Sequence, residues 1–211
     1  MAKKTHYHTR FEPGGFYHIY NRAIDRKPLF KRDENFRFFL SRMQKYLSPV
    51  LEIHAYCLLT NHFHLLVKIR TQFPPKLRSG EADVHLIVTQ HLQRFFQSYA
   101  MAFNRQENRI GSLFQQPFKR AHITSDVYMT WLVFYIHSNA QKHAMVDDFK
   151  KWKWSSYRGF VEQKGPKRRR EIIACFGSRE AFFQFHNQQL QTLNFLSPTR
   201  LDWLQGKQSP L

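Results

Sequence analysis

Apolar residues recur along the chain at two spacings, and each spacing predicts one kind of element. Alternation at every second residue, with aromatic and β-branched side chains, predicts strands. Apolar residues three and four positions apart predict helices. Pro28, Ser48 and Pro49 mark breaks between these segments. The predicted strands span residues 16–23, 51–58, 62–69 and 117–123, and the predicted helices span residues 33–47, about 92–103, and 125 or 126 to about 142.

The helices and the central strands carry local signals of their own. Asp33 is the predicted N-cap of the first helix, and Ser125 or Asp126 is the predicted cap of the third. Only residues 59–61 (Leu-Thr-Asn) separate the second and third strands, which predicts a hairpin. Residues 71–83 contain two prolines and a glycine and are expected to form an exposed loop.

The order of these elements is strand, helix, strand, strand, helix, strand and a further helix. This order predicts an α+β fold of the ferredoxin-like kind, an antiparallel sheet with helices packed on one face. We expect this domain to occupy residues 1–157. Residues 158–211 are expected to form a basic loop at 164–170 (KGPKRRR) and a C-terminal extension that is helical in places.

Charge narrows the class of partner. The chain has 211 residues with 33 Lys and Arg against 15 Asp and Glu, a net charge of +18. Like charges repel in a folded protein, so such an excess favours a polyanionic partner whose counterions are released on binding. Nucleic acid is the first candidate, and an anionic membrane surface is the second.

The two cysteines, Cys57 and Cys175, are too few for a disulfide framework and are expected to be reduced thiols. No apolar run is long enough to span a bilayer, and the polar, basic start does not resemble a secretion signal. We therefore expect a cytoplasmic protein without a membrane partner.

His62 and His64 flank Phe63 in a predicted strand. Because side chains alternate across a strand, both imidazoles should project to one face, where they could share a metal ion. The pattern is weak alone, since the chain has 12 histidines. His54, His122 and His137 are alternative ligands that spacing does not exclude.

Tyr135 and Asn139 are four residues apart in the third predicted helix and should lie on the same helical face. Asn139 could complete the shell of Mg²⁺ or Mn²⁺, while the Tyr135 oxygen attacks a metal-bound phosphate and displaces a 3′ oxygen. The product would be a 5′-phosphotyrosine and a free 3′-hydroxyl. Tyr135 could equally be a core residue of an apolar helix, and Tyr99 is a competing nucleophile.

Several ordered motifs resemble one family. They are AYCLLTNHFHLLV at 55–67, FYHIYNR at 16–22, GSLFQ at 111–115, YIHSN at 135–139 and WSSY at 154–157. Together they closely resemble the single-tyrosine HUH transposases, and more narrowly the REP-associated tyrosine transposase branch.

The resemblance implies a ferredoxin-like fold, dependence on a divalent metal, and binding of single-stranded DNA ends that form hairpins. It also implies that Tyr135 rather than Tyr99 is the nucleophile and that Asn139 is the third metal contact. Two residues depart from the family pattern, since Ala140 and Thr60 stand where proline is usual. The cleavage and rejoining of single-stranded DNA by transesterification is the activity implied.

The strand that is cleaved must also be held, so basic residues that flank the motifs are candidate DNA contacts. They are Arg22, Lys68, Arg70, Lys119 and Arg120. Any one of them could be an ordinary solvated surface residue.

Two other functions fit the same motifs. One is a domesticated, sequence-specific DNA-binding protein that has lost transposition, and the other is a replication-initiating or relaxase nickase. The sequence leaves open whether the chain forms a homodimer that exchanges its tyrosine helix.

Overall fold

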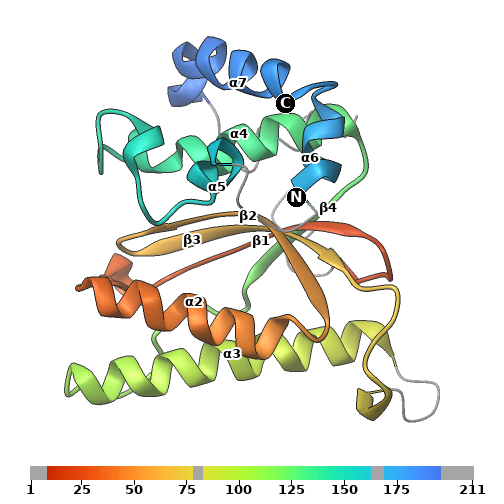
Figure 1. The fold of residues 1–211 in the computed structure, drawn as a ribbon. Helices are drawn as coiled ribbons and strands as arrows, with labels where there is room; N and C mark the ends of the chain where they lie inside the picture. The colour runs from red at the N-terminus through yellow and green to blue at the C-terminus, as the bar shows by residue number, and fades with distance from the viewer. Residues whose placement is uncertain (1–8, 78–82, 163–168, 196–211) are drawn as a thin grey trace, which may run out of the picture.

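The computed structural model of the chain describes residues 9–77, 83–162 and 169–195. At its centre lies a four-stranded antiparallel sheet with the strand order β2-β3-β1-β4 (Figure 1). The strands are β1 (Phe16–Arg22), β2 (Leu51–Leu59), β3 (His62–Ile69) and β4 (Lys119–Ile123). This order is that of the predicted ferredoxin-like plan, and the α+β class is confirmed.

Two long helices cover one face of the sheet, and a third helix covers the other (Figure 1). The first layer holds α2 (Asp33–Leu47) and α3 (Val84–Gln106), as predicted. On the opposite face lies α4 (Asp126–Lys142), with α5 (Tyr157–Val161), α6 (Arg169–Cys175) and α7 (Arg179–Gln188) around it. The expectation of helices on one face therefore holds for α2 and α3, and α4 adds a third layer. Short 3-10 turns are η2 (Ile24–Arg26), η3 (Pro75–Leu77), η4 (Phe149–Lys151) and η5 (Gln189–Phe195).

The alternation of β3 divides its residues between the two layers. Phe63 and Leu65 join the core under α2 and α3, whereas Leu66 joins the core under α4. Because side chains alternate, His62 and His64 lie on the same face as Leu66. The single sheet thus presents an aromatic surface to one layer and its histidines to the other.

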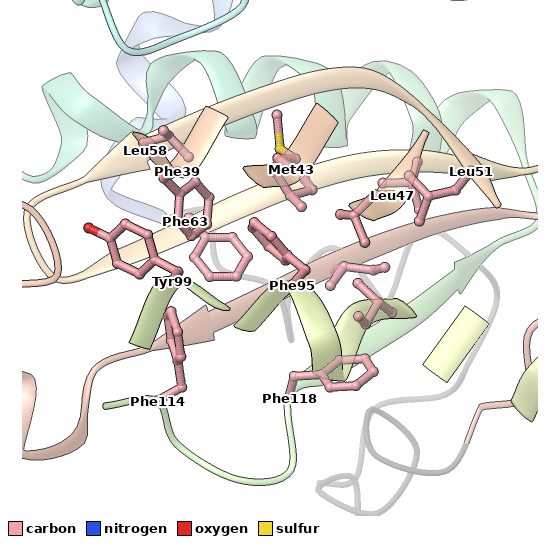
Figure 2. Close-up of a cluster of buried hydrophobic side chains, with 14 of the residues drawn as sticks. Phe39, Met43, Leu47, Leu51, Leu58, Phe63, Phe95, Tyr99, Phe114 and Phe118 are labelled. Atoms are coloured by element: carbon pink, nitrogen blue, oxygen red, sulfur yellow. The ribbon is translucent and has the colours of Figure 1, made fainter. Parts of the chain in front are cut away.

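The core below the sheet is aromatic (Figure 2). Phe39 packs edge-on against Phe95 and Tyr99, with ring centroids 4.8 and 5.0 Å apart, and it also contacts Phe63. Each fully buried Phe contributes roughly 2–3 kcal/mol to stability relative to exposure. This packing fixes β3, and with it the two histidines on the other face.

Buried side chains surround almost the whole of α4. The Ser125 side chain caps it by accepting a hydrogen bond from Tyr128 N, as predicted. A helix buried on all sides shows no clear amphipathic stripe, so its pattern does not say which face of the sheet it covers.

Residues 154–156 return to the sheet and pair with the outer edge of β2. Leu58 N donates to Trp154 O at 3.0 Å, and Ser156 N donates to Tyr56 O at 2.9 Å. The edge strand is therefore paired with the chain's own backbone.

Element boundaries differ from the predictions at several places. β1 ends at Arg22 rather than residue 23, β2 ends at Leu59 rather than residue 58, and α3 spans Val84–Gln106 rather than about residues 92–103. The N-cap of α2 is Arg32 rather than Asp33, because the Asn35 side chain accepts a hydrogen bond from Arg32 N. β4 begins at Lys119 instead of residue 117.

The C-terminal extension packs on α4, with Ile172 and Phe182 in the same core cluster. Residues 164–168 of the predicted basic loop at 164–170 lie outside the described residues, and its last two residues, Arg169 and Arg170, belong to α6 rather than to a loop. Within the described part of the chain, none of the helices combines the length and the apolar character needed to cross a membrane.

Candidate active site

The candidate site lies between the start of β3 and the last turns of α4. His62 and His64 lie on one face of the sheet, as the strand alternation predicted, and the structure places α4 over that face. Their ring centroids are 5.3 Å apart at an interplanar angle of 87°. One metal ion bound by a nitrogen of each ring at about 2.1 Å would hold the two centroids roughly 5 Å apart. The pair therefore has a spacing that suits a shared ion.

A second polar group holds one nitrogen of each imidazole. His62 Nδ1 lies 2.7 Å from Asn61 Oδ1, and His64 Nδ1 lies 2.9 Å from His18 Nε2. A proton on Nδ1 of each ring satisfies both contacts and leaves the Nε2 lone pairs for a ligand. This is the arrangement in which an outer partner fixes the tautomer of a metal-binding histidine.

Burial keeps both imidazoles neutral. It lowers the pKa of His62 to about 3, with the nearby His143 and Arg22 adding to the effect and Asn139 opposing it. Burial, followed by the neighbouring His18, holds the pKa of His64 well below its usual range. Neutral imidazole is the form that coordinates metals, so both rings are in the binding form at neutral pH.

Tyr135 reaches the site from α4. Its ring centroid is 5.2 Å from that of His64, and its side chain is almost wholly buried. Burial raises the pKa of the Tyr135 phenol to about 12, while Asn139 and Arg22 act to lower it. Lys142 Nζ lies 5.4 Å from the centre of the same ring. The phenol is thus close to the histidine pair and within the influence of cationic side chains.

Asn139 lies one turn after Tyr135, and its amide has an unused acceptor. Its Nδ2 donates to Tyr135 O at 2.9 Å, whereas its Oδ1 is buried without a hydrogen-bond partner. A buried acceptor without a partner costs roughly 1–3 kcal/mol, which a metal ion or donor at that atom would offset. Asn139 also influences the pKa of both His62 and Tyr135, so its amide lies close to both side chains.

These residues fit a divalent ion with mixed nitrogen and oxygen ligands. Across the described ranges, no three His, Cys, Asp or Glu side chains gather in a way that could hold a metal. A complete shell would therefore need Asn139 Oδ1 and oxygens from solvent or substrate beside the two histidines.

The competing residues lie elsewhere. Tyr99 belongs to α3 on the other side of the sheet, where its hydroxyl donates to Leu29 O at 2.5 Å and burial raises its pKa. His122 stacks on Tyr17 in that same half of the molecule. His54 lies near Glu171, and His137 lies between His186 and Ser156. The contacts described for these four side chains are made with groups other than the pair formed by His62 and His64.

The five predicted DNA contacts have different surroundings. Arg22 stands opposite His62 in the sheet, and its charge acts on His62, His64 and Tyr135. Lys119 lies over Tyr20, which stacks on His64. Both therefore belong to the site.

The other three predicted contacts lie away from it. Lys68 pairs with Glu171, and Arg70 pairs with Glu52 at 2.9 Å. Arg120 is buried on the opposite face, where its Nε donates to Thr9 O at 2.5 Å.

Sequence reasoning did not single out two histidines of the site. His18 bonds to His64, and His143 places its ring 4.7 Å from that of His62. A signal for His143 was present, since it follows Asn139 by four residues. His18 is brought in by strand pairing, which local spacing does not reveal.

Comparisons with known proteins support the fold. No protein-family model matches the chain, and no curated protein matches it. A solved structure of a REP-associated tyrosine transposase bound to a REP hairpin is similar, with a TM-score of 0.57 and 18% sequence identity. The similarity covers 77% of this chain and 88% of that one. The resemblance seen in the motifs therefore extends to the fold.

Proposed function

We propose that the protein cleaves and rejoins single-stranded DNA by transesterification, with Tyr135 as the nucleophile. The observation that carries this proposal is the contact between the rings of Tyr135 and His64, whose centroids are 5.2 Å apart. The buried Oδ1 of Asn139, which has no hydrogen-bond partner, lies on the same helix as Tyr135. The phenol and the amide oxygen come from α4 and the two neutral imidazoles come from β3, so two elements of the fold contribute these groups. The net charge of +18 agrees with a nucleic-acid substrate.

His62 Nε2, His64 Nε2 and Asn139 Oδ1 are the atoms that would hold a divalent Mg²⁺ or Mn²⁺ ion. When bound, such an ion supplies Lewis-acid polarisation of the phosphoryl oxygens. Phe63 contributes indirectly, because its burial under α2 and α3 fixes the strand that carries both ligands.

Tyr135 would attack phosphorus through its phenolic oxygen. The new O–P bond forms as the bond between phosphorus and the 3′ oxygen breaks, the phenol loses its proton, and the leaving 3′ oxygen gains one. The protein keeps a 5′-phosphotyrosine, and a 3′-hydroxyl can later attack it to rejoin a strand without an external energy source.

Arg22 has two roles in this proposal. Its charge lowers the pKa of the Tyr135 phenol, and a guanidinium binds phosphate oxygens in a bidentate manner. The Tyr135 side chain is only 4% exposed, so a bound strand must displace covering side chains before the phosphate reaches its oxygen.

A strand with a hairpin is the proposed substrate. The similar solved structure is bound to a REP hairpin, and this supports the choice of substrate by analogy of fold.

The decisive test uses a labelled single-stranded oligonucleotide with a hairpin, incubated with and without Mn²⁺ or Mg²⁺. We expect a covalent adduct on a denaturing gel that requires the metal and releases a fragment with a 3′-hydroxyl. Tyr135→Phe should abolish the adduct, and Tyr99→Phe should retain it. An adduct that survives in Tyr135→Phe, or no adduct with any hairpin strand, would contradict the proposal.

A further inference from the structure

An open cavity lies on the other side of the sheet from Tyr135. It has a volume of about 900 Å³ and is lined by α3, residues 111–118 and the adjoining ends of β1 and β4. This volume lies within the range of small-molecule sites. The cavity contains none of the residues assigned to the reaction.

Amide side chains are the main polar groups of this cavity. Five of them line it: Asn21, Gln93, Gln97, Gln115 and Gln116. Gln93 and Gln97 are exposed and four residues apart, so they lie along one stripe of α3. Thr89 begins the same stripe, and its Oγ1 is buried without a hydrogen-bond partner. The wall therefore offers donors and acceptors that the protein itself does not fully use.

The remaining lining is aromatic and cationic. Phe96 packs against Phe114 and Phe118, with ring centroids 5.2 and 5.6 Å apart. The Arg120 guanidinium lies 5.2 Å from the centre of the Phe118 ring. Among the described residues that line the cavity, none is Asp or Glu. A flat ligand attached to a negatively charged group would find here an apolar surface to pack on, amides to hydrogen-bond with, and one cation.

An unpaired nucleobase of a DNA strand is a ligand of this kind. Asn and Gln side chains can form hydrogen bonds with the donor and acceptor groups on the edges of bases, and bases stack on aromatic side chains. A base that belongs to a DNA strand also brings a phosphate, which suits Arg120.

The cavity adjoins the reaction site through the end of β1. Asn21 lines the cavity, while its neighbour Arg22 lies on the side of His62 and Tyr135. Gln115 N donates to Arg22 O at 2.9 Å, so the cavity wall is bonded to the residue that serves the site. A strand that rounds this end of the sheet would pass from one face to the other within a few nucleotides, since packed layers are about 10 Å apart.

We propose that this cavity binds an unpaired nucleobase of the DNA strand, a few nucleotides from the phosphate that is cleaved. The identity of the strand rests on the proposed function. The cavity would then choose where the strand is cut by reading a base that takes no part in the chemistry.

The test measures binding with Tyr135→Phe protein, which cannot form the adduct. Oligonucleotides with a hairpin and a single-stranded flank carry one abasic residue at successive positions, and their dissociation constants are compared by fluorescence anisotropy. We expect about a tenfold loss of affinity at one or two flank positions. When Gln93→Ala or Gln97→Ala is added, the protein should bind the intact strand more weakly. Most of the extra loss of affinity that an abasic residue causes at those positions should then disappear. Gln90→Ala is the matched control, because Gln90 is an exposed glutamine of α3 that does not line the cavity.

Equal abasic losses in all three glutamine variants would overturn the inference, as would a flank with no sensitive position. Adduct formation by protein with Tyr135 intact reports on the chemistry separately. If an adduct forms but the abasic losses do not depend on Gln93 and Gln97, the cavity proposal is wrong and the proposed reaction is not. Coupling without an adduct would support base binding and count against the proposed reaction.

Discussion

His18 Nε2 lies 2.9 Å from His64 Nδ1, so two buried histidines on the neighbouring strands β1 and β3 share one hydrogen bond. Tyr20 stacks on both rings, at 4.6 and 5.5 Å. The contact fixes the orientation of the His64 ring and leaves its Nε2 for a ligand.

His18→Ala should therefore lower the affinity of the protein for Mn²⁺. Loss of an outer partner of a metal-binding histidine typically costs about 10- to 100-fold in affinity. Titration calorimetry with Mn²⁺ measures it directly, and His18→Asn should recover part of the loss because an amide can still bond to Nδ1. His122→Ala removes a strand histidine that stacks on Tyr17 and serves as the control. Equal Mn²⁺ affinity in His18→Ala and the parent protein would remove His18 from the site.

Asn139→Ala should weaken Mn²⁺ binding by about tenfold or more and prevent adduct formation, because it removes the proposed oxygen ligand. The cost to stability should be small, about 1 kcal/mol, since only the bond from Nδ2 to Tyr135 O is lost. Ser138→Ala removes a similar bond, from Ser138 Oγ to Phe134 O at 2.7 Å, and is the matched control. If both variants lose the same Mn²⁺ affinity, Asn139 is not a ligand.

Arg22→Gln should weaken binding of single-stranded DNA and make it less sensitive to salt. Each phosphate contact adds about 0.7 to the slope of log K against log salt for a single strand. Lys68→Gln provides the comparison, because the charge of Lys68 is paired with Glu171. Binding measured between about 50 and 200 mM salt, a range over which such affinities change by orders of magnitude, should show the smaller slope in Arg22→Gln only. The reverse order would show that Lys68 rather than Arg22 holds the strand.

His186 should make the protein sensitive to acid. It lies on α7 and is buried against α4, with its Nε2 3.1 Å from His137 Nδ1, and burial lowers its pKa to about 4. An unfolded chain takes up this proton near pH 6.5, so between about pH 6.5 and 4 the unfolded state binds more protons. The free energy of unfolding should therefore keep its full value above about pH 6.5 and fall by about 3 kcal/mol on acidification to pH 4.

Urea unfolding at several pH values measures this loss. His186→Gln can still form hydrogen bonds but does not titrate, so its stability should fall less steeply over the same interval. An unchanged m-value would show that the same transition is being compared. Parallel pH curves for His186→Gln and the parent protein would contradict the assignment.

Local spacing was enough to predict the parts of the site that lie on one element. Alternation placed His62 and His64 on one face, and four-residue spacing placed Tyr135 above Asn139. The side of the sheet that α4 covers was not predictable, because α4 is buried all round and has no polar stripe. The roles of Lys119 and Arg120 depend on the pairing of β4 with β1. That pairing puts Lys119 beside Tyr20 and Arg120 under the opposite layer. The register between strands that are far apart in the chain cannot be read from a single sequence.

The pairing of residues 154–156 with the edge of β2 has a kinetic consequence. The chain leaves β4, forms the helix that carries Tyr135, and is then bonded back to the sheet that carries His62 and His64. The helix that carries Tyr135 is therefore held at both ends to the sheet of its own chain. A molecule held in this way would assemble its proposed reacting groups without an encounter with another copy. The rate of strand cleavage per bound strand should then be first order, and independent of how concentrated the protein is.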